Sequence, residues 1–383
     1  MPVTVAHLTT VDMSLRFLVL AQLRAVRDIG GRAIGISAPG PWVAELEAEG
    51  IEHRALASST RAMDPIADVG AARELWRILR RERVDVLHTH NPKPGLYGRV
   101  VGRAARVPIV VNTVHGLYAT EDDPLAKRTL VYGLEAVASR CSDAELFQNP
   151  EDLALMRRLH LTRNAHYLGN GVDLTRFDRA RFSVDQRDAA RAEIGATDTD
   201  VVVGAVGRLV AEKGYPELFE AFELLPAPFR LVVVGGHDPE KPDSLAADVV
   251  QRAREQGVMF LGHRDDVDRL YAAMDVFVLA SHREGFPRAA MEAAAMGLPV
   301  VATDIRGCRE VVDPGATGAL VPVGEPPALA AALRGLADES RRRKLGQAAV
   351  AWAGQHFDER RVVQTVLDTY RNVARRKGLV LAL

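Results

Sequence analysis

Two glutamates that are close in the sequence, Glu284 and Glu292, have seven residues between them. The run 275–280 before them is short, apolar and β-rich, which predicts a buried parallel strand. Pro287 stands where a first helical residue would stand, and the alanine-rich segment 288–296 has a strong helix propensity. We therefore expect a strand, then a loop that carries Glu284, then a helix that carries Glu292.

This expected helix start predicts a binding site for phosphate groups. A helix N-terminus at the carboxyl end of a parallel strand presents free backbone N–H groups and the positive end of the helix dipole. Phosphates bind at such ends, in the crevice where open α/β sheets place their ligands. Because each helical residue adds roughly 1.5 Å, Glu292 lies more than a turn inside the helix and can reach a group beside the phosphates, such as a ribose.

A second charged pair, Arg208 and Lys213, follows a predicted strand over 201–207. A guanidinium fork and an ammonium group at one strand end suit a diphosphate, whose charge they could stabilise as a bond to it breaks. Gly204 and Gly207 resemble part of a dinucleotide fingerprint, but the full G-x-G-x-x-G pattern is absent, so we expect no NAD site. The alternative for Arg208 and Lys213 is a solvated charge cluster.

Histidines follow two predicted strands of the N-terminal half. A strand over 84–89 contains His88 and leads to His90, and a buried strand from Ile109 ends at His115. Two histidines at i and i+2 could bind a metal, but no third ligand lies nearby in the sequence, so we predict no metal site. We expect His90 to face a ligand hydroxyl, whereas His88 could equally belong to a capped loop.

The run from Glu284-Gly-Phe-Pro to Glu292, with Gly297-Leu-Pro-Val-Val-Ala-Thr303 after it, closely resembles the Glu-x7-Glu signature of retaining glycosyltransferases of family 4. Further segments resemble elements of that family and extend the resemblance over nearly the whole chain: His115-Gly116, Asn170-Gly-Val-Asp173 and Gly207-Arg208 with Glu212-Lys213-Gly214. The resemblance implies the α/β fold class GT-B, two Rossmann-like doubly wound domains that face each other across a crevice.

The resemblance also implies a reaction. The enzyme would move a hexosyl or N-acetylhexosaminyl group, with retention, from a nucleoside diphosphate sugar to a hydroxyl acceptor, and we expect UDP as the nucleotide. Arg208, Lys213 and the helix N–H groups would neutralise the leaving diphosphate, so we expect no required metal and no permanently bound cofactor. Glu292 would bind the ribose, Glu284 would hold the sugar hydroxyls or stabilise charge at the anomeric carbon, and His115 would lie beside the donor sugar.

The predicted site residues fall into three groups. Those expected to act in catalysis are His115, Arg208, Lys213 and Glu284. Those expected to bind the nucleotide sugar are Ser14, Gly207, Arg208, Lys213, Arg264, Glu284, Gly285, Phe286, Pro287, Arg288 and Glu292. Those expected to bind the acceptor are Asp12, His90, Asn91, Lys93 and Tyr118; Thr120 and Glu121 continue the loop of Tyr118, for which a surface-loop interpretation is stronger.

The loop after the first strand departs from the family pattern. Most members carry a Gly-Gly pair there that lets a diphosphate approach, whereas this chain has Asp12-Met13-Ser14. Ser14 could contact the phosphates or could simply cap a helix over 15–29. The segments 10–15 and 88–93 resemble transferases that build bacterial surface polysaccharides on lipid carriers, and a soluble metabolite or natural product stays open as the acceptor.

The composition is that of a globular protein with two domains. The chain has 383 residues, 48% of them hydrophobic, and its net charge of -1 gives no general electrostatic reason to bind nucleic acid. Cys141 and Cys308 fit no metal spacing and indicate a reducing compartment.

The N-terminus lacks a signal-peptide pattern and no run approaches about 18 apolar residues, so we expect a cytoplasmic protein. The basic and then apolar run 371–383 could contact an anionic membrane, although a helix packed on the first domain is favoured.

Strand–helix alternation predicts βαβ units and parallel sheets. We expect an N-terminal acceptor-side domain over 1–170, a linker over 171–200, a nucleotide-sugar domain over 201–357, and a helix over about 358–383 that packs back on the first domain. In the first domain we expect strands and helices that alternate as far as 143–148, taken as the last strand of its sheet. The predicted ranges are strands 3–8, 33–38, 53–57 and 84–89 and helices 15–29, 42–49, 69–83 and 123–138.

Two other classes of protein share this architecture. A nucleotide-sugar 2-epimerase should lack the glutamate pair around a helix that begins at proline. A protein that only binds nucleotide sugars should have lost the site residues, whereas Arg208, Lys213, Glu284 and Glu292 are all present. Both are therefore less favoured than a transferase.

Overall fold

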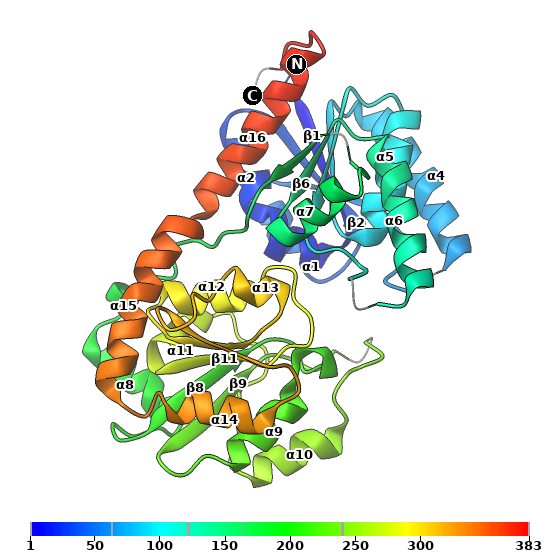
Figure 1. Cartoon of the computed structure of the whole chain (residues 1–383). Coiled ribbons are helices and arrows are strands. Elements are labelled where there is room, and N and C mark those ends of the chain that lie inside the picture. Colours follow the sequence, from blue (N-terminus) through cyan, green and yellow to red (C-terminus); the bar gives the residue numbers. More distant parts are fainter. Residues whose placement is uncertain (1, 63, 121–122, 163, 239–240, 382–383) are drawn as a thin grey trace. The chain divides into compact units, whose positions relative to one another are not determined.

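The computed structural model divides the chain into two compact units (Figure 1). Unit 1 is Met1–Gly169 with Arg360–Leu383, and unit 2 is Asn170–Glu359. The structure describes residues 2–62, 64–120, 123–162, 164–238 and 241–381. The segment 171–200, expected as a linker, lies in unit 2.

Unit 1 is built on a parallel sheet with the order β3-β2-β1-β4-β5-β6-β7. Its strands within the described residues are β1 (Thr4–Val11), β2 (Arg32–Ala38), β3 (Glu52–Ala55), β4 (Val86–Thr89), β5 (Ile109–Val114), β6 (Ala144–Phe147) and β7 (Ala165–Tyr167). The strand order reverses between β1 and β4, which are direct neighbours. In open α/β sheets, ligands bind at the carboxyl ends of the strands at this type of switch point.

Helices connect these strands and cover both faces of the sheet. They are α1 (Asp12–Ser14), the π-helical η1 (Leu15–Val19), α2 (Leu20–Asp28), α3 (Val43–Ala48), α4 (Pro65–Glu82), α5 (Pro92–Ala104), α6 (Leu125–Ser139), α7 (Pro150–Arg158) and α16 (Glu359–Arg376). The last helix, α16, runs alongside β1 and α2 (Figure 1). Its Val366, Leu367 and Tyr370 join the same hydrophobic core as Val5 and Leu23, so the C-terminal helix is part of unit 1.

Unit 2 repeats the architecture with the sheet order β10-β9-β8-β11-β12-β13. Its strands are β8 (Val201–Val206), β9 (Phe229–Val234), β10 (Met259–Phe260), β11 (Val276–Leu279), β12 (Val300–Thr303) and β13 (Gly318–Val321). Its helices are η2 (Arg179–Arg181), α8 (Val184–Glu193), η3 (Ala211–Lys213), α9 (Tyr215–Glu223), α10 (Ala247–Glu255), α11 (Val267–Ala273), α12 (Arg288–Ala295), α13 (Arg306–Arg309), α14 (Pro326–Arg334) and α15 (Glu339–His356). Two Rossmann-like parallel sheets confirm the predicted fold class.

The first helix differs from the prediction. In place of one helix over 15–29, the chain forms α1, η1 and α2, and Ser14 lies inside this run instead of capping it. The chain already turns at Asp12, because the Asp12 carboxylate accepts hydrogen bonds from the backbone N–H of Met13 (2.8 Å) and of Trp42 (2.7 Å). The N-cap interpretation of Ser14 was therefore wrong.

Two elements of unit 1 were not predicted. The strand over 143–148 is not the last of its sheet, since the three-residue β7 follows it at the edge. Helix α5 was missed because its sequence is rich in proline and glycine. Its glycines allow close packing on the sheet: a Cβ at Gly98 would lie 2.6 Å from Leu8, and one at Gly102 would lie 2.7 Å from Leu87.

In unit 2, Pro287 is the N-cap residue of α12, not its first helical residue. After α12, Gly297 adopts a positive φ of +77°, as expected for the residue that ends a helix. Among the described helices of both units, none combines the length and the apolar character that a membrane span requires.

Candidate active-site residues in the two units

An ion pair at the carboxyl edge of the unit 2 sheet joins the loops after β8 and β11, which are paired neighbours. The Nζ of Lys213 lies 2.6 Å from Oε1 of Glu284, and the Ser281 hydroxyl donates to the same oxygen at 2.8 Å. Lys213 and Glu284 come from distant parts of the chain, and both were predicted to act on one ligand. The fold brings them into contact at the switch point between β8 and β11.

Glycines make this contact possible. Gly214, directly after Lys213, has a φ of +68°, and a Cβ there would lie 1.9 Å from the carbonyl oxygen of Ala280. A Cβ at Gly235 would lie 1.8 Å from the carbonyl oxygen of Gly207. Only glycine tolerates such approaches, so these positions let the loops at the edge of the sheet lie directly against each other.

Arg208 follows β8 at the same edge. Its Nη1 lies 2.6 Å from Oδ2 of Asp238, and its side chain is 39% exposed. The Tyr215 hydroxyl donates to the carbonyl oxygen of Gly207 at 2.9 Å and so fixes the strand end before Arg208. Arg208 and Lys213 are thus both paired with carboxylates that an anionic ligand could replace.

Glu292 is buried on the first turns of α12. Its Oε1 accepts a hydrogen bond from Nε of Arg288 at 3.0 Å, and its Oε2 accepts one from the Tyr271 hydroxyl at 3.2 Å. Burial raises the pKa of the Glu292 carboxyl, and the nearby Arg288 guanidinium partly opposes this effect. Tyr271 was not predicted as a site residue, because its apolar neighbours in α11 mark it only as a core position.

The loop before α12 contains Gly285 and the buried Phe286. The Phe286 ring packs edge-on against Phe357 in the core of unit 2, and its carbonyl oxygen accepts a hydrogen bond from the Asn170 side chain at 3.4 Å. The Phe286 side chain therefore packs mainly in the core of unit 2. What α12 offers a ligand is its N-terminal backbone, since the first N–H groups of a helix have no partner inside the helix.

Arg264 was predicted to bind the nucleotide sugar, but its guanidinium is held by acidic neighbours. It forms two hydrogen bonds of 2.7 Å to Asp266 and one of 2.8 Å to Glu193. These contacts raise the pKa of Arg264 further above its ordinary value. Arg264 thus serves to join the loop after β10 to α8, and contact with a nucleotide sugar would need this cluster to open.

In unit 1, three residues predicted to bind the acceptor are held by other residues of the same unit. Asp12 is buried and holds the N–H groups described above, and the Asn91 side chain accepts a hydrogen bond from the backbone N–H of Thr10 at 3.2 Å. The Nζ of Lys93 lies 2.6 Å from Asp68. Asp12 and Asn91 therefore shape the loops at the ends of β1 and β4, and Lys93 joins α5 to α4.

The remaining predicted residues of unit 1 lie apart from these. Ser14 is partly exposed in the turn after β1. Tyr118 is half exposed, and the ammonium group of Lys127 lies 5.2 Å from the centre of its ring. Thr120 hydrogen-bonds Asp123 in the same loop, and Glu121 lies outside the described residues.

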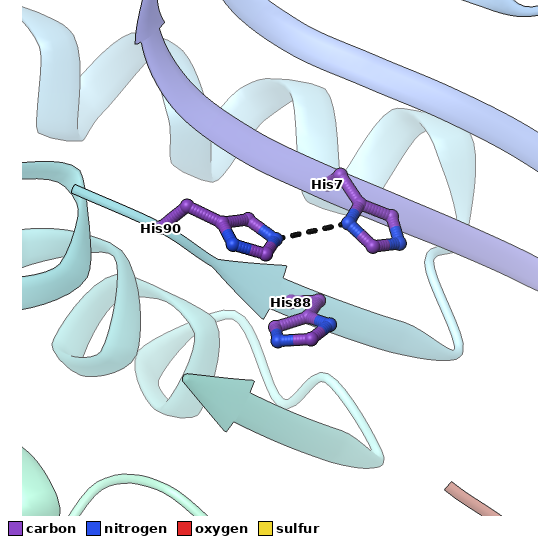
Figure 2. A group of neighbouring side chains, drawn as sticks. All are labelled: His7, His88 and His90. Atoms are coloured by element: carbon purple, nitrogen blue, oxygen red, sulfur yellow. Dashed lines mark hydrogen bonds between the residues drawn. The ribbon is translucent and has the colours of Figure 1, made fainter. Parts of the chain in front are cut away.

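His90 was predicted to face a ligand hydroxyl, and this prediction was wrong. His90 is completely buried, with its two ring nitrogens 3.0 Å from His7 and 3.0 Å from His115. His7 lies on β1 directly opposite His88 on β4, and the three buried rings gather beneath the strand ends (Figure 2). His115 is the one member of this histidine group that is partly exposed.

Sequence reasoning missed His7, which is a polar residue inside an otherwise apolar strand. With His7 present, the described residues do hold a group of three histidines, since one nitrogen each of His7, His88 and His90 lies within 4.8 Å of the others. Such a group could ligate a metal in principle. The ring nitrogens of His88, however, are already held by the Tyr370 hydroxyl at 2.6 Å and the Thr113 hydroxyl at 2.7 Å.

Comparison with known proteins places this chain in a family. Residues 186–352 match the model "Glycosyl transferases group 1", and residues 32–176 match the model "Glycosyltransferase Family 4". A D-inositol 3-phosphate glycosyltransferase of Xylanimonas cellulosilytica is 33% identical over 76% of this chain and 73% of its own length. The chain belongs to the family 4 glycosyltransferases. This confirms the resemblance carried by the Glu284–Glu292 segment.

Two further proteins similar to this glycosyltransferase differ in what they support. A UDP-Gal:alpha-D-GlcNAc-diphosphoundecaprenol alpha-1,3-galactosyltransferase of Escherichia coli is 31% identical over 64% of this chain, which spans 65% of that protein. The solved structure of Anabaena HepE with UDP and glucose has a TM-score of 0.81, covers 96% of this chain and 99% of its own, and is 22% identical. That structure supports the GT-B fold of this glycosyltransferase.

Proposed function

We propose that this glycosyltransferase moves a hexosyl or N-acetylhexosaminyl group from a UDP-sugar to a hydroxyl of a lipid-linked saccharide, with retention at the anomeric carbon. The observation that carries the proposal is the cluster at the end of β8, where Lys213 pairs with Glu284 and Arg208 pairs with Asp238. Two cations and a helix N-terminus at one sheet edge form a site for a diphosphate.

In the proposed binding step the ion pairs exchange partners. The diphosphate oxygens would take the place of Glu284 at Lys213 and of Asp238 at Arg208, so that no cation loses its partner. The released Glu284 carboxylate would then accept hydrogen bonds from hydroxyls of the donor sugar. Because Lys213, Arg208 and the first N–H groups of α12 together oppose the diphosphate charge, we propose that the reaction requires no metal ion.

In the transfer, one bond at the anomeric carbon breaks and another forms. The bond to the diphosphate oxygen breaks and its electron pair stays on the diphosphate, while the acceptor oxygen forms the new bond. The acceptor proton is taken up by the leaving diphosphate. Lys213 and Arg208 would stabilise the charge that develops on the leaving oxygen, and His115 would lie beside the donor sugar. Retention rests on membership of the family and its Glu284–Glu292 signature.

Glu292 would bind the donor ribose. Its carboxylate lies inside α12, beyond the N-terminal turn that would bind the phosphates, and it already accepts one hydrogen bond from Arg288 and one from Tyr271. A carboxylate with two oxygens can accept further bonds from the two ribose hydroxyls. Arg288 and Tyr271 would keep the carboxylate in position for these bonds.

A lipid-linked acceptor is supported by the name of the Escherichia coli relative, which acts on a diphosphoundecaprenol substrate. Family membership disfavours the 2-epimerase alternative, and a soluble metabolite is the less supported acceptor.

If the acceptor is lipid-linked, the enzyme must reach a membrane surface. We propose peripheral contact through α6, whose Leu125, Leu130, Leu134 and Val137 are between 41% and 74% exposed, because exposed apolar side chains on one helix fit the bilayer interface.

Sedimentation with vesicles tests the membrane contact. Vesicles of phosphatidylglycerol and phosphatidylcholine should retain the wild-type protein, and Leu130→Asp with Val137→Asp should abolish retention. Ile66→Asp on α4, another exposed apolar position, is the matched control and should leave retention unchanged. Equal retention of all three proteins would contradict a role of α6.

Calorimetric binding of UDP, GDP, ADP and NAD tests the donor site. We expect selective binding of UDP, weakened by roughly 1.5–3 kcal/mol in Glu292→Ala because charge-assisted bonds to the ribose are lost. Glu255→Ala, which removes an exposed carboxylate of unit 2, is the control and should bind like the wild type. Binding of NAD alone, or UDP binding that is indifferent to Glu292, would overturn the site assignment.

A further inference from the structure

The histidine group of unit 1 has more members than a metal site with three ligands requires, and its members follow one another in a definite order across the strands. Parallel pairing places His7 of β1 opposite His88 of β4, and β5, which pairs with β4, leads to His115. The C-terminal helix α16 adds the buried hydroxyl of Tyr370 from the far end of the sequence. Completely buried members such as His7, His88 and Tyr370 need hydrogen-bond partners within the protein, since water cannot reach them.

The contacts form one unbranched chain of hydrogen bonds from Thr113 to Gln148. The distances in order are Thr113–His88 2.7 Å, His88–Tyr370 2.6 Å, Tyr370–His7 3.4 Å, His7–His90 3.0 Å, His90–His115 3.0 Å and His115–Gln148 3.1 Å. Each imidazole in the chain uses one ring nitrogen toward each neighbour. Figure 2 shows the central link, in which the rings of His7 and His90 point at each other above His88.

Burial keeps the four imidazoles neutral at neutral pH. It lowers the pKa of His7 to about 3 and of His115 to about 4, and it lowers the pKa of His88 and His90 well below the ordinary value. Burial also raises the pKa of the Tyr370 phenol, which stays protonated. A neutral imidazole has one N–H donor and one acceptor nitrogen, so each histidine of the chain both donates once and accepts once.

The hydrogens of such a chain can all be donated in one of two directions, and the groups at the two ends of the chain favour one of them. If the hydrogens pointed from Gln148 toward Thr113, the buried Thr113 hydroxyl would accept from His88, and its own hydrogen would have no acceptor among the described residues. If they point from Thr113 toward Gln148, the Thr113 hydroxyl donates to His88 and the carbonyl oxygen of Gln148 accepts from His115. The second direction satisfies every group, so it is favoured.

We propose that Tyr370, His7 and His90 are positioning residues that hold His115 as one tautomer, with its hydrogen on Nδ1 and its Nε2 accepting from His90. The tautomer of an imidazole is set by the hydrogen bond that its other nitrogen makes. The one hydrogen that His115 can offer to a sugar oxygen is then the Nδ1–H now held by Gln148. This assignment of a donor role to His115 rests on the proposed function, whereas the tautomer itself does not.

A metal ion bound by His7, His88 and His90 is the competing account. Metal ligation needs a free lone pair on each ligating nitrogen. His88 would have to give up its hydrogen bond to Tyr370 or to Thr113, and the His7–His90 hydrogen bond would have to open. The hydrogen-bonded chain needs neither change.

Nuclear magnetic resonance of protein labelled with ¹⁵N-histidine tests the proposal directly. Long-range ¹H–¹⁵N correlations distinguish the two tautomers, and the His115 signals are identified by their loss in His115→Asn. We expect His7, His88, His90 and His115 all to carry the hydrogen on Nδ1. A hydrogen on Nε2 of His115 in the wild-type protein overturns the proposal, as does one equivalent of tightly bound zinc that is lost in His7→Gln.

Tyr370→Phe tests whether the effect passes through the chain. The variant removes one hydroxyl and keeps the ring, and in the hydrogen bonds of the described residues Tyr370 is linked to His115 through His7 and His90. We expect the His115 nitrogen signals to move toward values averaged between the tautomers. Tyr132→Phe removes a comparably buried hydroxyl of unit 1, bonded to Ala119 instead, and should leave the signals unchanged. Unchanged His115 signals in Tyr370→Phe would overturn the proposal.

Kinetics then tests the effect of the hydrogen-bond chain on turnover separately from the proposed function. In Tyr370→Phe we expect kcat to fall about five- to tenfold, as for loss of one hydrogen-bond constraint on an active-site group, while KM for the UDP-sugar changes less than about twofold. Absence of transferase activity in the wild type would contradict the proposed function alone, because the tautomer of His115 is measured without turnover. A normal kcat with a shifted tautomer would show that His115 is not a donor in the reaction.

Discussion

The two units of this glycosyltransferase use the same place in the same kind of sheet in opposite ways. At its switch point, unit 2 holds charged groups in pairs, such as Lys213 with Glu284. At its own switch point, unit 1 buries neutral imidazoles in a directed chain that reaches the partly exposed His115. Partly exposed ion pairs can exchange partners with an anionic ligand, whereas a buried neutral chain can fix only the orientation and tautomer of the group at its end.

The comparison therefore teaches that one architecture supports two kinds of preorganisation. In unit 2 the cations are kept paired until a diphosphate replaces the carboxylates, because an unpaired charge beside the buried strand ends would be costly. In unit 1 the cost of burial is met by complete hydrogen bonding. The predictions below test this contrast.

Acid should affect unit 1 first, and this is the largest expected effect. The pKa values of its four chain histidines are lower in the folded state than the unfolded value of about 6.5. Unfolded unit 1 thus binds more protons between pH 6.5 and about 3–4, so the stability is fully present above pH 6.5 and is lost as the pH falls. Each histidine contributes up to about 1.4 kcal/mol per pH unit in that window, so we expect several kcal/mol of loss by about pH 5.

In unit 2 the titrating groups differ. Carboxylates such as Asp266 and Glu193 have lowered pKa values, so their contribution is lost only below about pH 4. The pKa of Glu292 is raised, so protonation of this group favours the folded state as the pH falls. Tryptophan fluorescence can follow each unit, since Trp42 and Trp76 lie in unit 1 and Trp352 lies in unit 2. The Trp352→Phe variant then reports on unit 1, and the double variant Trp42→Phe, Trp76→Phe reports on unit 2. Acid transitions at the same pH in both variants would contradict the expected difference between the units.

Lys213→Met should abolish most activity without loss of structure. The cation that opposes charge on the leaving diphosphate is removed, and loss of one such preorganised group typically lowers kcat about 10²–10³-fold. Lys344→Met, at an exposed position on α15, is the control and should retain full activity. Turnover measured at saturating UDP-sugar decides the result, and a loss below about tenfold would show that the Lys213–Glu284 pair is structural.

Gly214→Ala should destabilise unit 2 by about 2–4 kcal/mol, because a Cβ would overlap the Ala280 carbonyl oxygen and the positive φ disfavours alanine. Gly257→Ala is the matched control, since Gly257 also has a positive φ but has open space around its Cα. It should cost about 1 kcal/mol. Urea unfolding measures both losses of stability. Equal losses would mean that the loops of Gly214 and Ala280 do not pack tightly against each other.

Tyr271→Phe should give the smallest effect. It removes one hydrogen bond to the Glu292 carboxylate and leaves the one from Arg288 in place. We expect UDP to bind about two- to fivefold more weakly, as for one hydrogen bond of about 0.5–1 kcal/mol. Calorimetry measures the change. An effect as large as that of Glu292→Ala would instead make Tyr271 a direct ligand of the nucleotide.

Predictions from the sequence were reliable where a pattern was local and strong. The strand before Glu284 and the helix after Pro287 follow from apolar runs, alanine propensity and the stops at Gly297 and Pro299, and they lie within a residue of their predicted bounds. The parallel sheets followed from the alternation of strands and helices. Helix α5 was missed because local propensity argues against a helix so rich in glycine, and only close packing on Leu8 and Leu87 explains those glycines.

Side-chain surroundings were the part that local patterns could not supply. Arg264, Lys93 and Asp12 were predicted to bind ligands from their positions at strand ends, yet each is held by partners that only the fold brings near: Glu193, Asp68 and Trp42. His90 was predicted to face a ligand for the same reason. Position along a strand indicates which edge of the sheet a residue reaches, but it does not tell whether another layer of the protein covers that residue.

The sequence by itself determined the family, the two parallel sheets and the Glu284–Glu292 segment, because these depend on residue types at short spacings. Only the tertiary structure decided that Lys213 meets Glu284 and that His7, His88, His90 and Tyr370 form one buried chain. Those contacts join residues separated by 71 to 363 positions. Strand register and helix packing bring such residues together, and no local propensity encodes either of them.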